Sequence, residues 1–144
     1  AVVEDIVRRY SLSRSLFHVE VTENALVENA GLIQDGVQRF RELGYEVWLD
    51  DFGSGYSSLN VLKDYKFDEL KLDMAFLRTF NEASTKIIRS SVCLAKELGM
   101  HTLAEGVETA EQVAFRRSIG CEKMQGWYYG KPLPYEECRQ QMEL

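Results

Sequence analysis

Three times along this chain, a helix-like pattern ends at a glycine that leads directly into a strand-like pattern. The sequence reads RELG, KELG and RSIG at Gly44, Gly99 and Gly120. Glycine just past a helix can adopt the left-handed cap conformation without a Cβ clash. Because each glycine is followed at once by an apolar strand pattern, the chain predicts repeated helix–strand units. Such repeats build a parallel sheet, so the expected fold class is α/β.

Hydrophobic periodicity extends this alternation over the whole chain. Helices are predicted at residues 1–10, 29–43, 57–65, 84–98, 109–119 and 134–144. Strands are predicted at residues 16–21, 45–50, 68–73, 101–106 and 121–127. Thr109 and Gln112 have the spacing of a capping box. Ile87 and Leu98 are expected on the buried side of their helix, and His18 and Trp48 are expected in the core.

Length and composition are those of a single globular domain, residues 1–144. Hydrophobic residues make up 45% of the 144 residues and charged residues 28%, which allows a sizeable core. No apolar run is long enough for a transmembrane helix, and the amino terminus does not resemble a signal peptide. Cys93, Cys121 and Cys138 are odd in number and widely spaced, which favours reduced thiols and a cytoplasmic location.

The net charge of −6 comes without a basic stripe. This argues against binding to DNA or RNA, because such binding requires cations that neutralise phosphates. A phosphate ligand held through a bridging metal ion remains compatible with an acidic protein.

Charged and polar side chains recur where the predicted strands end. They are Glu20, Asp50, Asp51, Lys71, Asp73, Glu105 and Gln125, and Glu23 and Glu108 follow shortly after two of these strands. In a parallel barrel these strand ends converge on one mouth, where active sites lie. An acid after a strand can instead cap the next helix, and a role as cap or loop anchor is favoured for Glu23 and Glu108.

Glu20 and Lys71 are harder to explain as caps, because each lies inside a strand between apolar neighbours. By strand alternation they point away from those neighbours, and a charge on an enclosed face must be paired or metal-bound. Oxygen ligands without nearby Cys or His select Mg²⁺, Mn²⁺ or Ca²⁺ over zinc. Adjacent Asp50 and Asp51 offer a way to bind two metal ions, which can clamp an in-line phosphoryl displacement. Lys71 would orient the water or stabilise the anion.

Two further segments have open interpretations. Gly53 and Gly55 precede SSL, where Ser57 or Ser58 could cap a helix, and the same loop could hinge over a substrate. The aromatic cluster WYYGKPLP, which includes Trp127 and Tyr128, is typical of core and turn packing. Alternatively, one of its rings could pack near a nucleobase.

In order along the chain, the blocks VEVTEN, DDFGSGYSSL, LKLDMAF, LAEGVET and GCEKMQGWYYGKPLP resemble the EAL-domain family of bacterial cyclic di-GMP phosphodiesterases, from about residue 12 onward. The resemblance implies a modified TIM (β/α)₈-type barrel that hydrolyses cyclic di-GMP to linear pGpG with Mg²⁺ or Mn²⁺.

The resemblance also implies roles for individual residues. The metal ligands would be Glu20, Asp50, Asp51 and Glu105. Lys71, Glu105 and Asp51 would act in catalysis. Glu108, Gln125 and Asp73 would bind substrate or metal-bound water. Glu23 and Gly53 would anchor the loop after the paired aspartates.

The sequence departs from the family at one point. It contains neither the Glu-Ala-Leu motif nor the following-strand asparagine, two expected metal ligands. We therefore expect a barrel that is incomplete at its N-terminus, with open strand edges that favour self-association. Upstream regulatory domains are expected as well. Hydrolysis by this chain alone should be poor or absent, and the alternative is a non-catalytic module that binds cyclic di-GMP or a partner.

Overall fold

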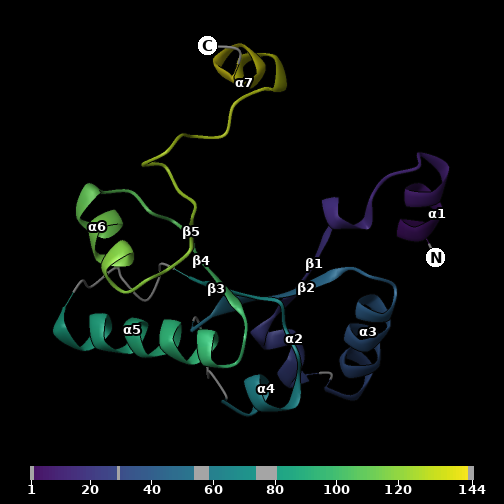
Figure 1. Ribbon diagram of the computed structural model, residues 1–144, viewed down its shortest axis with the longest axis horizontal. Helices are drawn as coiled ribbons and strands as arrows, with labels where there is room; N and C mark the ends of the chain where they lie inside the picture. Colours follow the sequence, from purple (N-terminus) through teal and green to yellow (C-terminus); the bar gives the residue numbers. More distant parts are fainter. Residues whose placement is uncertain (1, 29, 54–58, 74–80, 143–144) are drawn as a thin grey trace.

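Five parallel strands form a single sheet at the centre of the computed structural model, which describes residues 2–28, 30–53, 59–73 and 81–142 (Figure 1). The strands are β1 (His18–Thr22), β2 (Glu46–Phe52), β3 (Glu69–Leu72), β4 (His101–Ala104) and β5 (Lys123–Met124). They lie side by side in chain order, and every neighbouring pair is parallel. This confirms the α/β class and the parallel sheet, which is a fragment of a TIM-like barrel.

The helices are α1 (Val2–Arg9), α2 (Glu23–Glu28), α3 (Ala30–Glu42), α4 (Leu59–Asp64), α5 (Glu82–Glu97), α6 (Ala110–Ser118) and α7 (Tyr135–Met142). Figure 1 shows α2 to α5 along one side of the sheet and α6 beside β5, whereas α1 and α7 lie beyond the opposite side. Helix α7 stands apart from the sheet and buries none of its residues. None of the helices in the described ranges is long and apolar enough to span a membrane.

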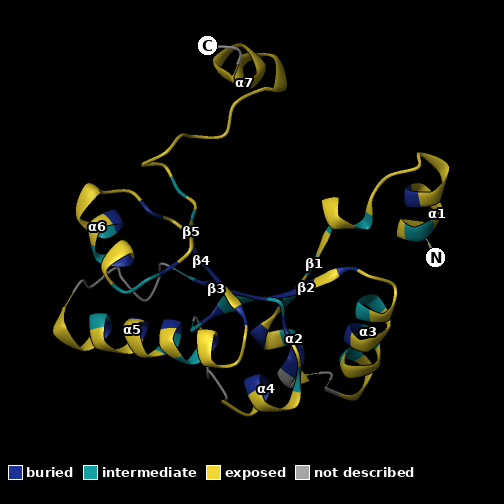
Figure 2. Cartoon of the chain, viewed as in Figure 1, coloured by how far each residue is buried: buried dark blue, intermediate teal, exposed yellow. Residues whose placement is uncertain are grey.

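The core lies between the sheet and the helices on that one side (Figure 2). Val47, Leu49 and Leu70 are fully buried there, and Val92 and Ala95 of α5 pack into the same cluster. The strand registers place the alternate side chains on the other, inner face of the sheet. That inner face carries His18, Glu20, Trp48, Asp50, Glu69, Lys71 and Lys123. The sheet is therefore apolar toward the helices and polar on its inner face.

The helix–glycine–strand pattern is confirmed at all three sites. Gly44, Gly99 and Gly120 have φ values of 88°, 78° and 78°. The residue after each glycine donates a backbone hydrogen bond back into the helix, as from Met100 N to Ala95 O at 2.9 Å. This is the Schellman arrangement, and it places Tyr45, Met100 and Cys121 in buried positions as the chain turns toward the next strand.

Several element boundaries differ from the sequence expectations. The strand predicted at 16–21 begins at His18, because Arg14–Leu16 forms a 3₁₀ turn capped by Ser13. Helix α2 was not predicted. The strands predicted at 68–73, 101–106 and 121–127 end earlier, so Asp73, Glu105 and Gln125 lie just beyond them. The capping box of Thr109 and Gln112 is confirmed at α6.

Three burial expectations were wrong. His18 is exposed on the inner face, and Ile87 and Leu98 of the α5 segment are about half exposed. For the aromatic cluster, whose interpretation was open, residues 127–129 form a turn, whereas Trp127 is 60% exposed and not packed into a core. These residues share a cause: they lie on surfaces of the sheet and helices that no described part of the chain covers.

Helix α1 is attached to the fold through Glu4. Its carboxylate accepts two hydrogen bonds from Arg14, at 2.9 and 2.8 Å, and one from the Tyr45 hydroxyl at 2.6 Å. The hydrogen bonds from Arg14, then from Tyr45, lower the pKa of Glu4 from 4.5 to about 2. The hydrogen bond to Glu4, then burial, raises the pKa of Tyr45.

This attachment should depend on acidity. Because the folded-state pKa of Glu4 is depressed, its contribution to stability is present above about pH 4.5 and is lost as the pH falls toward 2. Glu4→Gln should therefore lower the melting temperature at pH 7, and the difference from the parent chain should shrink between pH 4.5 and pH 2. Thermal melts across this range test it, and a difference that does not change with pH would contradict it.

Candidate active site

Lys71 lies at the centre of the candidate site. It comes from the middle of β3, and its side chain is only 8% exposed. Its Nζ lies 2.9 Å from Asp50 Oδ1, 3.0 Å from Glu20 Oε1 and 3.0 Å from Glu105 Oε1. The three carboxylates come from β1, from β2 and from the residue after β4. The sheet thus brings together residues that are 85 positions apart in sequence, from 20 to 105.

Burial works against the charged form of Lys71, but the hydrogen bonds to its three carboxylates outweigh burial. They hold the pKa of the ammonium above its ordinary value. Lys71 therefore remains a fixed cation in this setting, with its three donors directed at oxygens. The ammonium is a poor proton acceptor, and it could orient a water molecule or an anion only with a donor that one of these carboxylates releases.

The paired aspartates face the same side because the strand is irregular there. The β2–β3 register shifts between Leu49 and Phe52, which marks a bulge. Asp51 has φ 56°, in the left-handed region that Asp tolerates better than most residues. Its backbone N–H donates to Asp50 Oδ1 at 2.9 Å. Successive residues of a regular strand point to opposite faces, so the bulge is what lets both carboxylates reach one site.

Asp50, Asp51 and Glu105 each direct a carboxylate oxygen to a common point, with the three oxygens within 4.8 Å of one another. Burial, then the charges of Asp50 and Asp73, raises the pKa of Asp51. A divalent cation would relieve this repulsion, and an all-oxygen set suits Mg²⁺, Mn²⁺ or Ca²⁺. Glu20 is outside this trio but belongs to the same cluster through Lys71.

Glu23 connects α2 to the loop after the paired aspartates. Its side chain is 2% exposed, and its Oε2 accepts a hydrogen bond from Gly53 N at 3.3 Å. The loop-anchor role that the resemblance implies for Glu23 and Gly53 stays a prediction. Gly55, Ser57 and Ser58 lie outside the described residues. Helix α2 had a recognisable signal, because Thr22 precedes it and its Oγ1 accepts from Ala25 N at 3.4 Å.

A second group of predicted residues lies around a recess beside the carboxylates. Glu105, Glu108 and Gln125 line it together with Trp127 and Lys131, and its volume is ≈ 880 Å³. The Lys131 ammonium lies 4.8 Å from the centre of the Trp127 ring. The recess therefore offers carboxylates, an amide, an aromatic face and a cation next to the Lys71 cluster.

Gly126 shapes this recess, and the sequence analysis missed it. Val107 N donates to Gln125 O at 3.0 Å, so the two segments run in contact. A Cβ at Gly126 would lie 2.2 Å from the backbone N and O of Val107. The available signal was a glycine inside the strand predicted at 121–127, since glycine in a strand interior often marks a close backbone approach.

Comparison with known proteins identifies the family that this chain matches. The EAL domain family model matches residues 2–132. The chain is 42% identical over 118 residues to the cyclic di-GMP phosphodiesterase PdeR of Escherichia coli, covering 81% of this chain and 18% of PdeR. It is 37% identical over 134 residues to the cyclic di-GMP phosphodiesterase NbdA of Pseudomonas aeruginosa, covering 92% of this chain and 17% of NbdA. The chain spans less than a fifth of either curated relative.

Solved structures that are similar to this chain belong to the same family. The EAL domain of Mycobacterium smegmatis DcpA matches with a TM-score of 0.88 and 31% identity, covering 98% of this chain and 64% of that one. The PaMucR phosphodiesterase in its c-di-GMP complex matches with a TM-score of 0.87 and 34% identity, covering 94% of this chain and 56% of that one.

Proposed function

This chain belongs to the EAL domain family, and we propose that it is a cyclic di-GMP phosphodiesterase module. It would hydrolyse one phosphodiester bond of cyclic di-GMP to give linear pGpG, with Mg²⁺ or Mn²⁺. The observation that carries the proposal is the convergence of Asp50, Asp51 and Glu105 beside Lys71. The PaMucR structure, which holds c-di-GMP, supports the choice of substrate.

The proposed roles are those that the family resemblance implies. Asp50, Asp51, Glu105 and Glu20 would hold the divalent cations, and bound cations would supply charge neutralisation and activate water for the displacement. Lys71 would hold the attacking water or the developing negative charge in place, Glu105 would act as general base, and Asp51 would also act in catalysis. Glu108, Gln125 and Asp73 contact the substrate, and Glu23 anchors the loop at Gly53.

We propose that the isolated 144-residue chain is a weak catalyst. It lacks the Glu-Ala-Leu glutamate and the asparagine that the family resemblance implies as further ligands, and fewer charged ligands mean lower metal affinity. The alternative function, a non-catalytic module that binds cyclic di-GMP, predicts binding without turnover. An assay of pGpG formation with Mn²⁺, run beside a binding titration, separates the two.

We also propose that the open sheet edges take part in assembly. β1 and β5 each pair with one neighbour only among the described strands, and an unpaired edge is a template for another chain. Light scattering should show self-association that grows with concentration, and a monomer at high concentration would argue against it. The greater length of the curated relatives leaves room for upstream regulatory domains.

Replacing one proposed ligand should weaken metal binding strongly. Asp51→Asn removes a charged oxygen ligand while keeping the side-chain shape. We expect the Mn²⁺ dissociation constant to rise at least tenfold, because even indirect partners of metal ligands change affinity by about 10–100-fold. Water-proton relaxation with Mn²⁺ measures this. Asp35→Asn, at an exposed position of α3, is the matched control, and equal effects of the two variants would refute the ligand role.

A further inference from the structure

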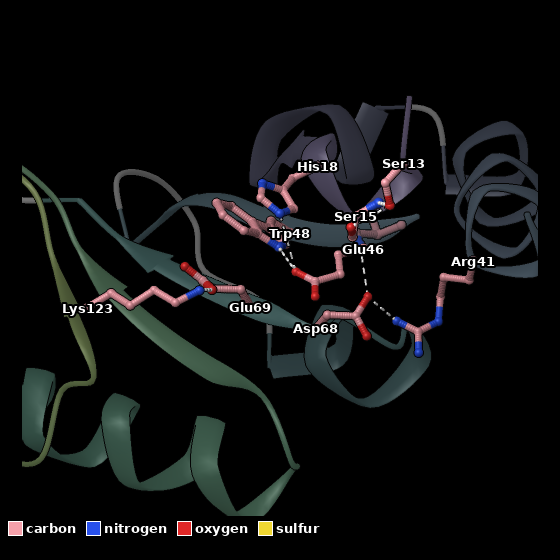
Figure 3. Close-up of polar contacts among 10 residues, drawn as sticks. Ser13, Ser15, His18, Arg41, Glu46, Trp48, Asp68, Glu69 and Lys123 are labelled. Atoms are coloured by element: carbon pink, nitrogen blue, oxygen red, sulfur yellow. Dashed lines mark hydrogen bonds and ion pairs between the residues drawn. The ribbon is translucent and has the colours of Figure 1, made fainter. Parts of the chain in front are cut away.

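A second set of side chains, shown in Figure 3, lies on the inner face of the sheet, and its members precede the residues of the proposed site in sequence. We call His18, Trp48, Glu69 and Lys123 the floor cluster. The His18 and Trp48 rings stack, with 3.9 Å between centroids and an interplanar angle of 16°. The Lys123 ammonium lies 5.1 Å from the Trp48 ring centre and pairs with Glu69 Oε2. Four strands thereby contribute to one continuous set of contacts.

Each member of the floor cluster lies two residues before a residue of the proposed site in the sequence. The pairs are His18 and Glu20, Trp48 and Asp50, Glu69 and Lys71, and Lys123 and Gln125. The first three pairs each lie within one strand, where residues two apart share a face, and Gln125 directly follows β5. The floor cluster therefore forms the layer next to the site on its amino-terminal side. Layers of this kind fill the interior of parallel barrels.

The pair Glu69–Lys123 spans the sheet in an unusual way. Glu69 is on β3 and Lys123 is on β5, so their contact passes over β4, which lies between those strands. Glu69 is 1% exposed, and its Oε1 has no hydrogen-bond partner within the described part of the protein. Lys123 is half exposed. A buried carboxylate is costly without its cation, so the contact of Lys123 with Glu69 across β4 is favoured.

We propose that the floor cluster positions the metal-binding layer, with Glu69–Lys123 as the contact that sets the curvature between β3 and β5. This inference rests on the proposed function for its link to metal. The pair links β5 to β3. It thereby fixes the distance from Lys71 to Glu105, which follows β4, and to Gln125, which follows β5. Trp48, placed between His18 and the ion pair (Figure 3), supports Asp50 from below. These are positioning residues, since none of them is a proposed ligand.

Electrostatics and positioning predict opposite results for Lys123→Met. If Lys123 contributed only its charge, removing a cation near the site would tighten Mn²⁺ binding. If Lys123 positions the ligands, the same variant should weaken Mn²⁺ binding about tenfold, as loss of a ligand's supporting contact does. Lys123→Arg keeps the pairing with Glu69 and should restore affinity to within about twofold of the parent chain.

The test has two readouts on the whole chain. The first is the ¹⁵Nζ resonance of Lys71 in metal-free protein, which should shift in Lys123→Met and return in Lys123→Arg. The second is Mn²⁺ affinity from water-proton relaxation. Lys63→Met, which removes an exposed lysine paired with Asp64, should change neither. An unchanged Lys71 resonance in a folded Lys123→Met variant would overturn the inference. Failure of the parent chain to bind Mn²⁺ would instead overturn the proposed metal site, and the resonance alone would then decide the positioning role.

Discussion

Lys71→Met should destabilise the metal-free protein by roughly 2–3 kcal/mol and abolish any hydrolysis of cyclic di-GMP. The ammonium is 8% exposed and balances three converging carboxylates. Removing one partner of a buried ion cluster costs about 3–5 kcal/mol. We expect a loss of only roughly 2–3 kcal/mol here, because Glu20 and Glu105 are 44% and 27% exposed and water screens their charges. Urea unfolding in EDTA measures the change.

Added metal should have a diagnostic effect on the same variant. With the Lys71 charge gone, a divalent cation is the remaining way to neutralise the cluster, so Mn²⁺ should raise the melting temperature of Lys71→Met more than that of the parent chain. Lys63→Met, at a lysine side chain 71% exposed, removes the same charge at a distant surface and should alter stability by less than about 0.5 kcal/mol. A Lys71→Met variant as stable as Lys63→Met in EDTA would show that the carboxylates do not depend on this cation.

Gly126→Ala should destabilise the protein by about 3 kcal/mol or more. The added Cβ would lie 2.2 Å from both N and O of Val107, and Val107 is fully buried. These are backbone atoms, so no side-chain rotation relieves the overlap, and the two segments must separate. Their separation would also weaken the hydrogen bond from Val107 N to Gln125 O and open the recess that Gln125 lines. Thermal and urea unfolding measure the loss.

Gly36→Ala provides the matched control for this substitution. Gly36 lies inside α3, and nothing lies within 4 Å of a Cβ added there. Alanine in a helix interior is favoured over glycine by about 0.5–1 kcal/mol, so the control should gain stability. If Gly126→Ala and Gly36→Ala changed stability alike, the close approach of Gly126 to Val107 would not exist in solution.

Local patterns were enough to predict the sheet. The glycines at the helix ends, the capping box at Thr109 and the apolar strand cores depend on neighbouring residues, and all were recognisable without the fold. The charges within strands were equally informative, because Glu20 and Lys71 could be reconciled with apolar neighbours only by facing a separate, polar side. Their meeting at 3.0 Å follows from the parallel register.

The bulge at Asp50–Asp51 could not be predicted in the same way. The sequence places two aspartates in a row, and a regular strand would send them to opposite faces. Their convergence depends on the register between β2 and β3 and on the left-handed backbone at Asp51, which are properties of strand pairing. The exposure of His18 and Ile87 was missed for a related reason. The hydrophobic pattern of a segment predicts that one of its faces is apolar. Whether that face is buried depends on which other elements of the fold pack against it.

The floor cluster illustrates the same limit. From the sequence alone, each member would be interpreted as an ordinary core or surface residue of its own strand. Only the sheet order places Lys123 of β5 beside Glu69 of β3 and over the Trp48 ring.

Calorimetric titration of the 144-residue chain with cyclic di-GMP, in Mn²⁺ and again in EDTA, tests the central claim most directly. A metal-dependent phosphodiester site formed by Asp50, Asp51, Glu105 and Lys71 predicts binding heat in Mn²⁺. In EDTA, the affinity for cyclic di-GMP should be at least tenfold lower. The Asp51→Asn variant should lose the Mn²⁺-dependent binding. Equal affinity in both buffers, or no binding in either, would contradict the assignment of this carboxylate cluster as the site for metal and cyclic di-GMP.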